Sequence, residues 1–136
     1  MSLAFLSPGA FAGSAIGKVE LRGDVTSFEA ERIVRLTPRR AVALCADAPA
    51  FIARARAAGL RAYDLTGALT AIPIESEALL RRLTEVVVDA PTAAPVAGDV
   101  PALIFPLGDG HYELYVPQEL GHHVALVVLD LQAGLA

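Results

Sequence analysis

The sequence predicts an α+β fold, a mainly antiparallel sheet with helices packed on it. Short apolar runs, several with two-residue alternation, are separated by turns rich in Gly, Pro and Asp, which is the pattern of strands. From residue 41 onward the expected order is strand, helix, strand, strand, helix, strand, strand, helix. Such an order favours an antiparallel sheet with helices on one face over a doubly wound parallel sheet.

The composition limits the classes of protein and partner. With 136 residues the chain has the length of one domain, so a single domain is expected over residues 1–136. Hydrophobic residues make up 54% of it, which indicates either much buried alanine or apolar surface that meets a partner. A net charge of −4 argues against a nucleic-acid partner, because neutralising phosphates requires a clustered basic face. The apolar run 124–129 is far shorter than the roughly 20 residues of a membrane helix, so no membrane contact is expected.

The start of the chain and its single cysteine bear on the compartment. Residues 1–18 are rich in small and apolar residues but lack the positive start of a signal peptide. Cys45 has no partner for an internal disulfide, and its apolar setting AVALCA favours a buried thiol over a nucleophile. A cytoplasmic location is therefore expected.

The first thirty-five residues have the weakest pattern. KVELR, Lys18–Arg22, predicts a strand, and TSFEAERIVRL is compatible with a strand or a helix. Glycines at 9, 13 and 17 precede Lys18 as in a phosphate-binding loop. However, Ala12 and Val19 stand where that loop needs a glycine and a hydroxyl residue, so the interpretation is rejected.

The signals become clearer from Leu36. LTPRR predicts a turn, and AVALCA predicts a short strand. Asp47 is expected to cap a helix that has Pro49 in its first turn and ends at Gly59. LRAYDL and ALTAIPI predict two strands that Thr66-Gly67 joins as a hairpin.

The remaining sequence predicts two helices and a hairpin. Ser76 is expected to cap EALLRRLT, with the alanine and leucines of that helix buried and its two arginines in water. Residues 90–99 contain three structure breakers and predict a connecting loop. PALIFPL and HYELYVP predict a hairpin that turns at Asp109-Gly110, followed by a helix from Gln118 to Gln132 that is interrupted at Gly121.

Few side chains are candidates for catalysis, metal binding or ligand contact. The carboxylate of Asp64 can accept backbone N–H groups in a turn or contact a ligand, and the turn role is favoured. His122 and His123 would diverge by about 100° on a helix and are not expected to bind one metal together, and His111 is only a conjectural further ligand. Tyr112 and Tyr115 alternate along a strand, so at most one is expected in the core, leaving the other for a partner or a flat ligand. The arginines 54, 56 and 61 are interpreted as a solvated helix face.

The chain from about Leu36 to its end resembles the sarcosine oxidase gamma-subunit family, within the folate-binding domain group that includes the glycine-cleavage aminomethyltransferase. Four phrases in order carry the resemblance: LTPRRAVALCAD, YDLTGALTAIPI, EALLRRLT and VPALIFPLGDGHYELYVPQEL, the last being the most specific. The resemblance implies a fold like the aminomethyltransferase N-domain over residues 1–136. Residues 1–35 would be a compressed first segment, and 36–136 the region of resemblance.

Departures from the family pattern shape the functional hypothesis. Pro101 and Ala102 stand where aminomethyltransferases place a carboxylate against tetrahydrofolate, and Gly67 and Ala68 replace a histidine-methionine pair that lines the folate site. The resemblance therefore implies a non-catalytic accessory subunit of a heteromeric flavin amine oxidase in one-carbon metabolism, with flavin on larger partner subunits and no cofactor on this chain. A tetrahydrofolate-binding module, alone or as a homo-oligomer, and a diverged aminomethyltransferase half-domain remain alternatives. Ligand contact would then fall to Tyr63, Asp64, Asp99 and Tyr115. No catalytic or metal-binding residue is assigned.

Overall fold

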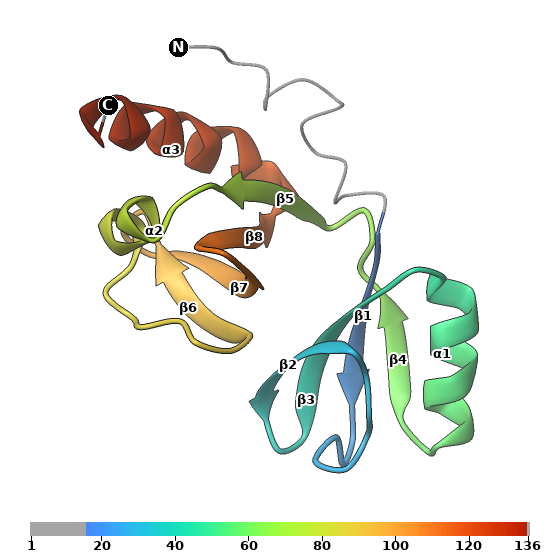
Figure 1. Ribbon diagram of the computed structural model, residues 1–136. Helices are drawn as coiled ribbons and strands as arrows, with labels where there is room; N and C mark the ends of the chain where they lie inside the picture. The colour runs from blue at the N-terminus through green and yellow to red at the C-terminus, as the bar shows by residue number, and fades with distance from the viewer. Residues whose placement is uncertain (1–15, 136) are drawn as a thin grey trace. The chain divides into compact units, whose positions relative to one another are not determined.

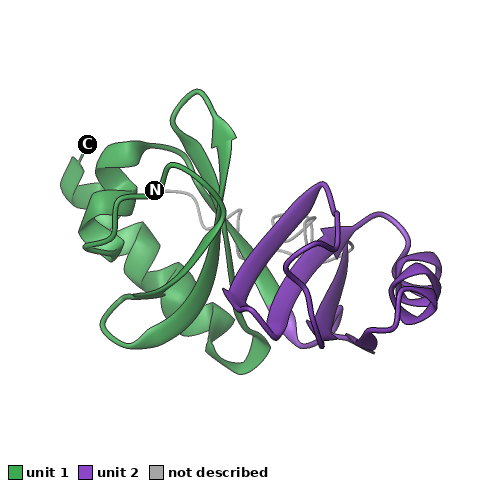
Figure 2. Ribbon diagram, turned by 90° about the horizontal axis from the view of Figure 1, so that it is seen from below, with its two compact units in different colours: residues 1–13, 70–136 green, residues 14–69 purple. Residues whose placement is uncertain are grey.

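The computed structural model describes residues 16–135. The chain divides into two compact units, which Figure 2 colours separately: unit 2 ends at Leu69 and unit 1 continues from Thr70. The interpretation of residues 1–15, including the argument against a signal peptide, lies outside the described residues, and the expectation of one domain over residues 1–136 stays a prediction. Of the helices that are described, none combines the length and the apolar character needed to cross a bilayer.

Unit 2 is built on a four-stranded antiparallel sheet, sheet A, in the order β2-β3-β1-β4 (Figure 1). Its elements are β1 Gly17–Arg22, β2 Arg32–Thr37, β3 Arg40–Cys45, α1 Ala48–Ala57 and β4 Arg61–Asp64. The strand predicted at KVELR is confirmed, and the second half of the ambiguous stretch TSFEAERIVRL lies in β2. The turn predicted at LTPRR joins β2 to β3.

One face of sheet A packs against α1. Val19 and Leu21 of β1 are fully buried there and pack with Phe51 of the helix. The Asp47 side chain accepts a hydrogen bond from the Ala50 N–H, which confirms the predicted cap. The helix ends just before Gly59, whose φ of +87° is the left-handed conformation expected at a helix stop.

Unit 1 holds the second sheet, sheet B, in the order β5-β8-β7-β6 (Figure 1). The elements are β5 Leu69–Ile74, α2 Glu77–Leu83, β6 Thr92–Val96, β7 Val100–Gly108, β8 His111–Pro117, a 3₁₀ turn η3 Gln118–Leu120 and α3 Gly121–Leu135. The hairpin β7–β8 turns at Asp109 and Gly110, whose φ values of +55° and +76° are those of a type I′ turn. The predicted Asp-Gly hairpin and final helix are confirmed.

The core of unit 1 lies between one face of sheet B and the helices α2 and α3. Tyr112, Leu114 and Val116 alternate inward from β8 and meet leucines of α2 and valines of α3. The predicted buried leucine stripe of α2 is confirmed, although Ala78, expected within it, is exposed. Because Leu114 is fully buried and belongs to this cluster, it is a sensitive probe of the core.

The first testable expectation concerns the start of α2. The Ser76 Oγ accepts a hydrogen bond of 3.1 Å from the Leu79 N–H, which otherwise has no partner within the helix. We expect Ser76→Ala to lower the free energy of unfolding by about 1 kcal/mol. Ser76→Asp keeps an acceptor at the same place and should stay close to the original protein in urea unfolding. Equal losses in both variants would contradict the capping role.

The predicted hairpin between β4 and β5 is wrong, although both strands form. The strand β4 pairs with β1 in sheet A, whereas β5 belongs to sheet B. After β4 the chain stays bonded to β1, because the Leu65 N–H donates to the Lys18 carbonyl at 2.6 Å and the Lys18 N–H donates to the Thr66 Oγ1 at 3.1 Å. The Thr66-Gly67 turn thus carries the chain from one sheet to the other.

The loop predicted over residues 90–99 is also wrong, because its middle forms β6 at the edge of sheet B. Ala94 and Val96 are buried in the core of unit 1, so small apolar side chains are enough to seat this strand. Pro95 lies opposite Pro101 of β7. An edge strand tolerates proline, since one row of its backbone groups has no neighbouring strand to bond.

Candidate functional site

Two of the predicted ligand residues lie next to one another at the end of β4. The Asp64 carboxylate accepts a 2.9 Å hydrogen bond from the Thr66 N–H, which is the geometry of an Asx turn. Hydrogen bonds from the hydroxyl and backbone of Thr66 lower the pKa of Asp64, and the charge of Lys18 adds to this. The turn role favoured from the sequence is confirmed. Tyr63 is 45% exposed, and the guanidinium carbon of Arg22 lies 5.6 Å from the centre of its ring.

The other two predicted residues lie in unit 1. Asp99 is exposed in the turn between β6 and β7. Tyr115 is only 1% exposed, its ring meets Phe105 edge to face at 5.6 Å, and its hydroxyl donates to the Glu113 carboxylate at 3.0 Å. Tyr115 pairs with Leu103, four residues along β7 from Asp99, so the two are roughly 13 Å apart along the sheet. They do not converge on one site.

The expectation that at most one of Tyr112 and Tyr115 lies in the core is wrong, since Tyr112 is 9% exposed and Tyr115 is 1% exposed. Pro101 and Ala102, which the resemblance places at folate-contact positions, carry no polar side chain. Ala102 is packed in the core of unit 1, and Pro101 is exposed on β7. Whether Tyr63, Asp64, Asp99 and Tyr115 contact a ligand stays a prediction.

The thiol and the imidazoles show no arrangement for catalysis. Burial raises the pKa of the Cys45 thiol, and the nearby carboxylates of Asp64 and Asp47 raise it further, so the thiol stays protonated. His122 and His123 are exposed at the start of α3. Within residues 16–135, no three His, Cys, Asp or Glu side chains gather in a way that could hold a metal ion.

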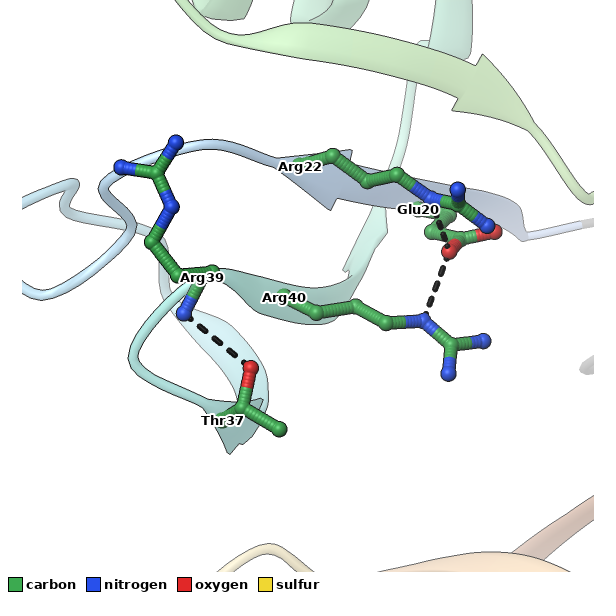
Figure 3. Close-up of polar contacts among 5 residues, drawn as sticks. All are labelled: Glu20, Arg22, Thr37, Arg39 and Arg40. Carbon is green, nitrogen blue, oxygen red and sulfur yellow. Dashed lines mark hydrogen bonds and ion pairs between the residues drawn. The ribbon is translucent and has the colours of Figure 1, made fainter.

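A charged cluster lies on the face of sheet A opposite α1. Glu20 of β1 is 7% exposed, and its Oε2 accepts hydrogen bonds from the Nε of Arg22 at 2.8 Å and the Nε of Arg40 at 2.7 Å (Figure 3). Burial alone would raise the pKa of Glu20, but the hydrogen bonds and charges of the two arginines outweigh it, so the pKa lies below its ordinary value. Glu20 is therefore a fixed anion that holds two guanidinium groups.

Strand pairing adds a third arginine to this cluster. Arg22 lies opposite Arg40 on one side and opposite Arg61 of β4 on the other, which places the three on one face of neighbouring strands. We call Arg40, Arg22 and Arg61 the arginine row. The Arg22 and Arg40 side chains are 47% and 50% exposed. Tyr63 lies opposite Glu20 on the same face and extends the row with a half-exposed ring.

The arginine row suits the binding of carboxylates or other oxyanions. Each guanidinium has five N–H donors, and Arg22 and Arg40 each use only the Nε donor on Glu20. The four Nη donors of each form no hydrogen bond within the described residues, and a guanidinium binds carboxylates with two parallel hydrogen bonds. Three guanidinium groups against one carboxylate leave two positive charges in this cluster.

Sequence reasoning missed this cluster. The arginines 54, 56 and 61 were expected to share a helix face, but Arg61 lies on β4. Arg54 stacks over Phe28 and Phe51 at 4.9 and 5.1 Å, and Arg56 donates to the Ala62 carbonyl. The signal that was present is the two-residue spacing of Glu20 and Arg22, which places them on one strand face. Arg40 and Arg61 lie beside Arg22 because of the strand register, which cannot be predicted from the local sequence.

A pH-dependent contribution to stability is expected from Glu20. Because its pKa is lowered in the folded protein, the charged cluster stabilises the fold fully above the ordinary carboxyl pKa of about 4.3, and this contribution is lost as the pH falls through the lower folded value. We expect Glu20→Gln to cost about 1 kcal/mol at neutral pH, since the arginines are half exposed to water. The gap between the two proteins in urea unfolding should shrink in acid. A gap that does not change with pH would contradict the ion-pair role.

No protein-family model matches the chain, and no curated protein matches it in sequence. Among solved structures, the chain is similar to a chain of the heterotetrameric sarcosine oxidase from Corynebacterium sp. U-96 in complex with pyrrole 2-carboxylate. The TM-score is 0.73 at 13% identity, over 88% of this chain and 80% of that chain. The predicted α+β fold is confirmed, and it is a fold that a chain of sarcosine oxidase shares.

Proposed function

We propose that this chain is a non-catalytic accessory subunit, of the sarcosine oxidase gamma type, in a heteromeric flavin amine oxidase. The observation that carries the proposal is the fold shared with a chain of a heterotetrameric sarcosine oxidase. The same aligned residues make up 88% of this chain and 80% of the other, so the matched chain is only about one-tenth longer than this one. A small subunit in a larger assembly is the expected counterpart.

The site geometry supports an accessory role. Asp64, in the phrase YDLTGALTAIPI, accepts a hydrogen bond from Thr66 in a turn, and this phrase holds no second carboxylate and no His, Lys or Cys to act with it. The positions that correspond to folate contacts are held by Pro101 and Ala102, and the latter is core. The most distinctive polar feature in the described chain is the arginine row, which is suited to docking. Flavin would then lie on the larger partner subunits.

The chain alone tests this proposal against the folate-binding alternative. Its mass in solution is measured by sedimentation, and tetrahydrofolate is titrated into it in a calorimeter. We expect no saturable folate binding, together with self-association or aggregation that the partner subunits relieve. A well-behaved monomer that binds tetrahydrofolate tightly would overturn the accessory role and favour the binding module.

A further inference from the structure

The charges of the chain are divided unevenly between its two units. Residues 14–69 contain nine of the eleven Lys and Arg residues and six of the fifteen Asp and Glu residues, a net charge of +3. Residues 70–136 contain two cations and nine carboxylates, a net charge of −7. A protein of overall negative charge therefore presents a positive unit, and the arginine row lies on it.

Two arginines of the row are preorganised in the absence of a partner. Glu20 fixes Arg22 and Arg40 through their Nε atoms, which limits the side-chain freedom that binding would otherwise remove. Arg61 is exposed and, within the described chain, forms no side-chain hydrogen bond or ion pair. A preorganised pair beside an uncommitted third guanidinium is stronger evidence for a binding surface than three independent arginines.

The exposure and spacing of the arginines favour a macromolecule over a small-molecule ligand. The row lies where β1 ends and where β3 and β4 begin, and the side chains of Arg22 and Arg40 are about half exposed. Small molecules are bound in hollows that cover most of their surface, whereas half-exposed side chains such as Arg22 and Arg40 give a ligand little cover. Neighbouring strands lie about 4.8 Å apart, so three arginines span roughly 10 Å. Carboxylates three or four residues apart on a partner helix, about 5–6 Å from each other, fit that spacing.

The charge balance favours a protein over a nucleic acid. Nucleic-acid binding typically rests on about 6–10 phosphate contacts, more than a row of three arginines provides. The nine carboxylates of residues 70–136 would also repel a long polyanion. A protein surface can present a few carboxylates locally without carrying a long run of negative charge.

We propose that the arginine row binds a carboxylate-rich surface segment of a partner protein, with Tyr63 packing against it. The proposal rests on the proposed function in one respect, since an accessory subunit needs a surface that docks. The hydrogen bonds run from the Nη atoms of Arg22 and Arg40 and from the guanidinium of Arg61 to the carboxylates of the partner. The Arg22 and Tyr63 side chains, 5.6 Å apart, offer the partner one cationic and one apolar contact.

The test uses the whole chain and a short peptide of alternating glutamate and glycine that carries a neutral dye. A glutamine-glycine peptide is the uncharged comparison, and the readout is fluorescence anisotropy over a range of salt concentrations. We expect the glutamate peptide alone to bind, and its affinity to fall as salt screens the charges. Equal binding of both peptides would overturn the proposal.

Variants locate the peptide on the surface. We expect Arg61→Gln and Arg40→Gln each to weaken peptide binding by roughly two- to fivefold. Arg39→Gln is the matched control, because it removes the same charge from the same unit while Arg39 points away from Arg22 and Arg40 (Figure 3). Arg61 makes no internal bond, so its variant should keep the original melting temperature even if Arg40→Gln lowers it. An equal loss in Arg39→Gln would overturn the proposal, because only net charge would then matter.

The same assay tests two other possible partners of the arginine row, nucleic acid and a second copy of the chain. A DNA duplex that displaces the glutamate peptide at lower concentration would assign the row to nucleic acid. Self-association that Arg61→Gln abolishes would assign it to a second copy of the chain. Either result overturns the choice of an acidic partner. If the peptide fails to bind but the chain still joins an oxidase assembly, the docking-surface proposal is wrong and the accessory-subunit proposal stands. If the peptide binds but no assembly forms, the accessory-subunit proposal is wrong and the docking-surface proposal stands.

Discussion

Replacing Leu114 by alanine is expected to lower the free energy of unfolding by about 3 kcal/mol. The Leu114 side chain is fully buried, and it packs in the cluster formed by sheet B, α2 and α3. The substitution removes apolar contacts and leaves a cavity that strands on both sides prevent from closing, since β8 lies between β5 and β7. Urea unfolding followed by circular dichroism measures the loss.

Leu107→Ala is the control for that loss. Leu107 is on β7, in the same hairpin, but it is 53% exposed, so the same change of side chain should alter stability by no more than about 0.5 kcal/mol. Similar losses at the two positions would contradict the assignment of the core to the inward face of sheet B.

Replacing Gly17 by alanine is expected to destabilise unit 2 by about 1–3 kcal/mol. A Cβ at this position would lie 2.8 Å from the Cys45 Sγ, 3.0 Å from the Ala48 Cβ and 3.1 Å from the Ala48 backbone nitrogen. Gly17 is paired with Cys45 across β1 and β3, so the chain cannot move away without disturbing the ladder. Either the thiol or the start of α1 must shift.

A second substitution separates these two contacts. Cys45→Ala removes the Sγ but leaves Ala48 in place, so in the Gly17→Ala background it should recover part of the lost stability. Gly67→Ala is the matched control, because a Cβ there meets nothing within 4 Å. Full independence of the Gly17 and Cys45 substitutions in a double-mutant cycle would contradict the crowding at the β1–β3 pair.

The Leu114 and Gly17 variants together test the prediction of a single domain. Leu114 probes unit 1 and Gly17 probes unit 2. If residues 1–136 unfold as one domain, each variant shifts a single thermal transition that includes both units. Two calorimetric transitions, of which each variant moves only one, would contradict the prediction.

Local patterns predicted the elements better than their pairing. Asp47 and Ser76 cap their helices and Asp109-Gly110 turns its hairpin, because each depends on side chains and dihedral angles within a few residues. The prediction of a β4–β5 hairpin failed because the Leu65 N–H donates to the Lys18 carbonyl and the Lys18 N–H donates to the Thr66 Oγ1, and Lys18 is far from both in sequence. The prolines and alanines of residues 90–99 likewise led to the prediction of a loop. The strand β6 forms there by pairing with β7, which the local sequence does not indicate.

The candidate site depended on the same missing information. Tyr63 and Asp64 could be selected because they sit in a recognisable turn motif, and the structure places that motif at the end of β4. The arginine row could not be selected, because Arg22, Arg40 and Arg61 are brought together by two antiparallel registers. Only the two-residue spacing of Glu20 and Arg22 was visible in the sequence. This spacing is common in strands and does not by itself indicate a binding site.

The most direct test of the accessory-subunit claim is co-expression of this chain with the large flavin-bearing subunits of a heteromeric sarcosine oxidase, followed by size-exclusion chromatography with detection of flavin absorbance. We predict that the chain elutes with the flavin in a fixed ratio to the large subunits, and that omitting it lowers the yield of assembled, sarcosine-oxidising complex. Large subunits that assemble and oxidise sarcosine equally well without the chain, while the chain elutes alone, would contradict the account.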